Sequence, residues 1–191
     1  MEDSNQLKST ALKYGGAFGA ILIVMMFVFY AISYKWFTSL TYMGLMFIIA
    51  IAVPTMAGIK RKKDSGGFLS FGHTWITMVL TYSIGAIISI VGTFLLFVVI
   101  EPELKDLLVE AQIEKTMSIM EMMGAPDEAI EQAMGEVDKQ SEAIRDQFSM
   151  VGMLTQTLKF ILIMAVILLI PAAIVKKKRP AGAIDEILDT E

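Results

Sequence analysis

Lys159 is the first residue whose type and position point to chemistry, because it stands inside a long apolar stretch near the carboxyl end of the chain. A lysine in a membrane-spanning helix is by default a candidate for an anionic-substrate site or a proton path, since an ammonium in hydrocarbon is costly. The 16 residues Phe160 to Val175 separate it from the basic run KKKR. As a helix they cover about 24 Å. Lys159 is therefore expected near the outer interface, where its side chain can reach water.

Two carboxylates flank a proline directly after the third apolar stretch, at Glu101, Pro102 and Glu103. A carboxylate close to an ammonium offsets the cost of a charge near hydrocarbon. We therefore predict that the Lys159 side chain points towards this corner and not into a central cavity.

His73 is the only histidine, and it follows three glycines in the segment SGGFLSFGHTW. An imidazole titrates near neutral pH, so His73 is a candidate for a pH-sensitive or ligand-contacting group. Its position at a membrane boundary, beside Gly66, Gly67 and Gly72, favours a polar anchor instead. A single histidine also leaves no partner for a two-histidine metal site.

Motifs of the common catalytic classes are absent. The chain has no cysteine, no Walker loop, no GxSxG elbow, no HExxH helix and no paired carboxylates within an apolar stretch. Its acidic residues lack the DxDxDG loop of a calcium site, so a solvated acidic face is expected. We predict no enzyme, no metal, no cofactor and no nucleic-acid partner.

These residues must be positioned by membrane helices. Apolar residues make up 55% of the 191 residues and charged residues 19%, and the charges are clustered. Four charge-poor runs approach the ~20 residues that cross a bilayer. The predicted spans are 14–34, 36–59, 78–100 and about 154–175, and 65–77 is predicted to lie in the interface. The alternative interpretation of the first run is a cleaved signal peptide. Its apolar core, however, is longer than the ~7–15 residues usual for the apolar region of a signal peptide.

Basic residues predict the orientation, because short loops rich in lysine and arginine stay in the cytoplasm. Ten of them fall before the first span, in the loop between spans two and three, or directly after span four. They are Lys8, Lys13, Lys60, Arg61, Lys62, Lys63, Lys176, Lys177, Lys178 and Arg179. Both termini, including the short tail 180–191, should therefore face the cytoplasm.

The segment 101–149 is then extracytoplasmic and strongly acidic, with 13 acids against 4 bases. Apolar residues recur at helical spacing on both sides of Gly124, Ala125 and Pro126. This pattern predicts a hairpin of two helices, and the second helix can continue into span four (150–179) because no glycine or proline lies between Gly135 and Gly152. Small residues four apart, such as Gly15 and Gly19, suit close helix contacts within one chain or between two copies.

The order of these motifs resembles the bacterial membrane family catalogued as domain of unknown function 4199. The stretches that carry the resemblance are LKYGGAFG, GGFLSFGHTW, IEPEL and MGAPDEAIEQAM, followed by a last span that ends in KKK. Gly66, Gly67, Phe71 and Gly72 match the glycine-rich start of the family's third span, whereas His73 and Trp75 depart from it.

The family's acid-Pro-Glu junction is matched by Glu101, Pro102 and Glu103, and its acidic turn by Asp127 and Glu128. The resemblance implies a bacterial inner-membrane location and no particular activity.

The sequence thus predicts an all-α chain: a four-helix transmembrane bundle with an extracytoplasmic helical hairpin between spans three and four. Besides the lipid bilayer, the expected partner is a membrane or envelope protein, or a second copy, docked on the acidic hairpin of a non-catalytic scaffold. The alternative is a small transporter or channel subunit that uses Lys159 and the small-residue helix faces.

Overall fold

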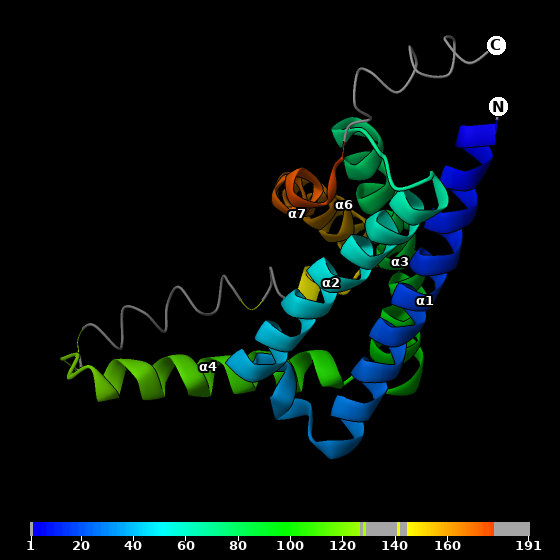
Figure 1. The fold of residues 1–191 in the computed structure, drawn as a ribbon. Helices are drawn as coiled ribbons and strands as arrows, with labels where there is room; N and C mark the ends of the chain where they lie inside the picture. The colour runs from blue at the N-terminus through cyan, green and yellow to red at the C-terminus, as the bar shows by residue number, and fades with distance from the viewer. Residues whose placement is uncertain (1, 127, 129–140, 142–144, 178–191) are drawn as a thin grey trace, which may run out of the picture. The chain divides into compact units, whose positions relative to one another are not determined.

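The structure is a computed structural model, and it describes residues 2–126, 128, 141 and 145–177 (Figure 1). These residues are almost entirely helical and include no strand, which confirms the prediction of an all-α chain. The helices are α1 (Glu2–Ile32), the 3-10 helix η1 (Tyr34–Thr38), α2 (Leu40–Asp64), α3 (Phe71–Phe94), the π-helical η2 (Leu95–Ile100), α4 (Leu104–Met122), α6 (Met150–Ile167) and α7 (Leu169–Val175).

Four helical stretches are long and apolar enough to cross a membrane, as the sequence predicts. They are Asn5–Ile32, Leu40–Asp64, Phe71–Ile100 and Met150–Val175. The third begins at Phe71, earlier than the predicted start at Met78. Ser70 explains this start, because its hydroxyl accepts a hydrogen bond from the amide of His73 and so caps the first turn.

The chain divides into two compact units, each described here by itself. The first unit comprises residues Met1–Gly19, Ile49–Ala86 and Ile161–Glu191, and the second comprises Ala20–Ile48 and Ile87–Phe160.

In the first unit, α1 and α3 make a close contact at a glycine. A Cβ on Gly15 would lie 2.7 Å from the Cβ of Ile84 and 2.9 Å from the carbonyl oxygen of Thr81. Phe18 in the next turn of α1 packs on Tyr82, with 5.6 Å between the ring centroids. The small residue Gly15 therefore serves a contact within the chain.

The glycine pair Gly66–Gly67 makes the turn that leaves α2. Both residues have positive φ angles, 71° and 86°, which side chains with a Cβ rarely adopt. After the turn, Leu69 exchanges two backbone hydrogen bonds with Lys177, at 2.9 and 3.0 Å. The Lys177 ammonium lies over the Phe68 ring, 5.3 Å from its centroid. We call this pairing of the loop with the basic segment after α7 the clasp.

The second unit has its core where α4 begins. Met26 of α1, Leu96 and Phe97 of η2, and Leu104 and Leu108 of α4 are buried together. Leu104 and Leu108 are four residues apart and so share one face of α4. Their burial fixes the start of α4 on the ends of the spans.

The predicted hairpin is described only in part. Its first helix is α4, which starts at Leu104, just after the predicted corner at Pro102, and it ends at a turn in which Gly124 has φ 72°. The second helix falls mainly on residues outside the described ranges. Its last residues do not continue into span four, because the chain turns at Phe148–Ser149 before α6 begins. The Ser149 hydroxyl accepts a hydrogen bond from the amide of Gly152 and caps α6 instead.

Candidate functional site

No ion pair joins Lys159 to Glu101 or Glu103. The Lys159 side chain is exposed on α6 between Leu158 and Phe160, which are also exposed, and it makes no ion pair with any residue in the described part of the chain. Glu101 instead accepts a hydrogen bond of 3.0 Å from the hydroxyl of Tyr30. A neutral donor from α1 thus occupies the carboxylate that was predicted to face the lysine.

His73 lies in the first turn of α3 with an exposed side chain. Its Nδ1 atom lies 3.0 Å from the hydroxyl of Ser70. Its backbone carbonyl accepts a hydrogen bond of 3.0 Å from the guanidinium of Arg61, and Arg61 also donates to the hydroxyl of Thr77 at 2.7 Å. The histidine therefore contributes to the packing of α2 on α3 through its backbone.

Arg61 was predicted only as one of the basic loop residues, yet its side chain is 1% exposed. It donates to Thr77, the middle residue of a column of three buried threonines on α3, Thr74, Thr77 and Thr81. Each of these hydroxyls donates to the carbonyl one turn earlier in the helix, which satisfies it internally. The threonine spacing is the sequence signal for this polar face, and the residue type of Arg61, an arginine among three lysines, is the signal for its burial.

Trp75 acts as a link between α3 and α6. Its indole N–H donates a hydrogen bond of 2.7 Å to the carbonyl of Ala165. Ala165 lies in the last turn of α6, where carbonyls lack partners within the helix. Trp75, which departs from the family's pattern at this position, thus has a structural role.

Polar contacts attach α4 to the η1 loop. Lys35 pairs with Glu114 at 3.0 Å, and the Lys115 ammonium donates to the carbonyl of Thr38. The hydrogen bond that the Lys35 ammonium donates to Glu114 raises the pKa of the Lys35 side chain. Because that pKa is raised, Lys35 keeps its charge at neutral pH, and its contribution to the pair is lost only as the pH rises through the raised value. The attachment is therefore intact at neutral pH.

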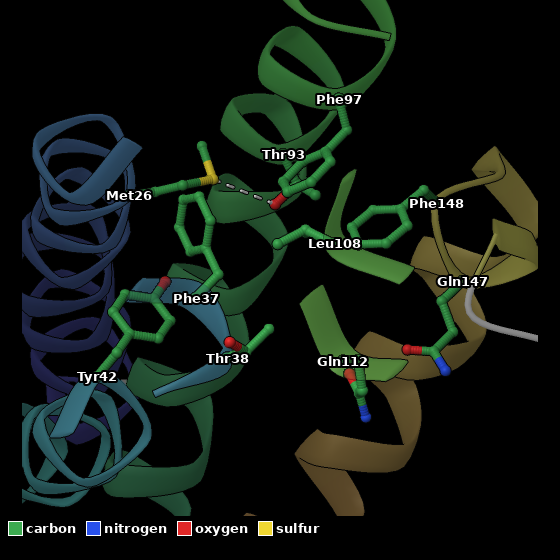
Figure 2. Close-up of a pocket in the computed structure, with 10 residues that line it drawn as sticks. All are labelled: Met26, Phe37, Thr38, Tyr42, Thr93, Phe97, Leu108, Gln112, Gln147 and Phe148. Atoms are coloured by element: carbon green, nitrogen blue, oxygen red, sulfur yellow. Dashed lines mark hydrogen bonds between the residues drawn. The ribbon is translucent and has the colours of Figure 1, made fainter. Parts of the chain in front are cut away.

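A pocket of about 360 Å³ lies in the second unit, between the ends of the spans and α4 (Figure 2). None of the side chains that line it is charged. They are Met26, Phe37, Thr38, Tyr42, Thr93, Phe97, Leu108, Gln112, Gln147 and Phe148.

The pocket has an apolar end and a polar end. Phe97 and Phe148 stack with 4.2 Å between their centroids, and Met26 lies beside Thr93, whose hydroxyl approaches the methionine sulfur at 4.0 Å. Figure 2 shows the carboxamides of Gln112 and Gln147 at the end away from Met26. Both glutamines are exposed, whereas Met26 and Phe97 are buried.

The lining of the pocket is chemically suited to an uncharged, largely apolar group. It holds no carboxylate, imidazole or ammonium that could act as an acid, base or nucleophile. Nowhere in the described part of the chain do three or more histidine or acidic side chains form a group that could hold a metal ion. Sequence reasoning missed this site because its polar residues, two glutamines, two threonines and one tyrosine, carry no motif.

A family model described as "Protein of unknown function (DUF4199)" matches residues 13–177. The chain belongs to this family. The match begins inside the first membrane-span candidate and covers the other three and α4, so DUF4199 membership confirms the resemblance inferred from the motifs. No curated protein and no solved structure matches the chain. The chain is thus a DUF4199 protein with four helices that fit a multi-pass membrane protein.

Proposed function

We propose that this protein is a non-catalytic membrane protein that docks a basic surface of another membrane or envelope protein on α4. The observation that carries the proposal is the contrast in burial between the start and the far half of α4. Its start is buried at Leu104 and Leu108, and Lys115 in its middle is bonded to the η1 loop. Its far half is exposed, with Met122 and Met123 at 81% and 80%.

Charge complementarity favours a basic partner. Glu110, Glu114 and Glu121 are exposed along α4, and the segment 101–149 carries 13 acids against 4 bases. Opposite charge across an interface speeds association and selects partners. Exposed methionines beside these carboxylates supply adaptable apolar contacts at the same surface.

A photoreactive amino acid at Ile119, which is exposed on α4, tests the proposal in native membranes. We expect one discrete protein adduct, and we expect the double variant Glu110→Gln with Glu121→Gln to lower its yield about tenfold, which corresponds to about 1.4 kcal/mol of binding free energy. The control Glu2→Gln with Asp3→Asn changes the net charge equally at the start of α1, keeps the carboxylates of α4, and should retain most of the adduct.

Two outcomes would contradict the proposal. One is the absence of any protein adduct, and the other is an adduct whose yield is the same in the glutamine variant. An adduct of twice the chain's mass would identify a second copy and exclude the heterologous partner. The transporter alternative rests on Lys159, and no specific observation favours it, since that side chain is exposed and does not line the pocket.

A further inference from the structure

We infer that the pocket of the second unit binds the upper part of one acyl chain of a bilayer lipid, from the leaflet on the side of α4. This inference does not depend on the protein partner proposed above. It rests on the place of the pocket along the spans, on the chemistry of its two ends and on its size.

The lining residues place the pocket at the level where the spans end. Tyr42 comes two residues after the start of α2, Phe97 three residues before the end of η2, and Phe148 two residues before α6. Met26 lies six residues before the end of α1 at Ile32. Six helical residues cover about 9 Å, so the pocket extends from the interface into the upper half of one leaflet, whose hydrocarbon is about 15 Å thick.

The lining chemistry matches the part of a lipid found at that depth. The buried end consists of the Phe97 and Phe148 rings and the Met26 thioether, which pack well against methylene groups. The exposed end carries the carboxamides of Gln112 and Gln147, which can donate hydrogen bonds to an ester carbonyl. A charged headgroup would remain outside, because no ionised side chain lines the pocket to compensate its desolvation.

The volume and the location favour a lipid over a soluble metabolite. A cavity of about 360 Å³ lies near the lower limit for ligand pockets, which is about 300 Å³. It accommodates one chain segment and not a whole two-chain lipid. The bilayer also presents acyl chains at this depth at all times, whereas a polar metabolite would have to leave water for an apolar site.

Photolabelling of the full chain in vesicles tests the inference. The vesicles contain phosphatidylcholine with a diazirine in the upper half of one acyl chain, and adducts are mapped by mass spectrometry. We expect adducts on Met26, Phe97 and Phe148. The variant Gln112→Trp should reduce these pocket adducts about tenfold, equivalent to about 1.4 kcal/mol, by filling the polar end.

Two controls keep the test decisive. Thr116→Trp adds the same ring one turn further along α4, outside the pocket, and should leave the pocket adducts unchanged. Adducts at exposed Leu158 report correct insertion in every variant, because that residue faces outward from α6. Thr93→Leu, which fills the pocket from α3, should reproduce the loss.

The inference is overturned if the pocket residues are labelled no more than Glu121, which lies in the exposed far half of α4. It is equally overturned if Gln112→Trp and Thr93→Leu leave pocket labelling unchanged while the Leu158 adducts are normal.

Discussion

At the scale of single residues, two adjacent glycines of α1 have opposite surroundings. A Cβ on Gly15 would lie 2.9 Å from the backbone oxygen of Thr81, whereas a Cβ on Gly16 would meet no atom within 4 Å. Gly15→Ala should therefore lower the free energy of unfolding by about 1–3 kcal/mol through overpacking. Gly16→Ala should be neutral or stabilising, because alanine favours a helix by about 0.5–1 kcal/mol over glycine. Thermal unfolding in detergent measures both, and equal effects of the two variants would argue against the α1–α3 contact.

At the scale of elements, the joint between Asp146 and Gly152 sets how α6 begins. A Cβ on Gly152 would lie 1.8 Å from the backbone oxygen of Asp146, so no side chain fits without moving the chain. We expect Gly152→Ala to displace the 145–149 segment and to break the ion pair of Arg145 with Asp106, now 2.7 Å. Distances between spin labels at Thr116 and Gln147 would report the displacement. Gly44→Ala, at a site with no atom within 4 Å of the added Cβ, is the matched control and should leave those distances unchanged.

At the scale of the whole molecule, the orientation in the membrane is the main prediction. Three basic groups alternate with the spans, which places both termini in the cytoplasm and Ala125 outside. Alkaline phosphatase fused after Ala125 should be active, and fusions after Lys63 or Pro180 should be inactive, because the enzyme folds only outside the cytoplasm. The reverse pattern would invert the topology and place the acidic α4 in the cytoplasm.

The sequence was sufficient for the spans because lipid imposes a length and excludes charge, a constraint that acts on each helix separately. It was insufficient wherever the outcome depended on a partner from another helix. Arg61 is buried while its neighbour Lys63 is exposed, and the threonine column on α3 explains the difference. The partner of Glu101 was not foreseen for the same reason, since Tyr30 of α1 donates to it. The pocket could not be foreseen, because Gln112 and Gln147 become neighbours only after α4 has packed.

The clasp between Leu69 and Lys177 has a consequence for the order in which contacts form while the chain is being synthesised. Leu69 precedes the third span, whereas Lys177 follows the last one. The ribosome therefore adds Leu69 to the chain long before it adds Lys177. Closing such a long loop costs entropy that is recovered only when the intervening helices are already in place. The two backbone hydrogen bonds therefore form late, and a chain that stalls before Lys177 leaves the N–H and C=O of Leu69 without this partner. A quality-control protease that reads exposed extended segments would find Leu69 unpaired in an unfinished copy and paired with Lys177 in a finished one.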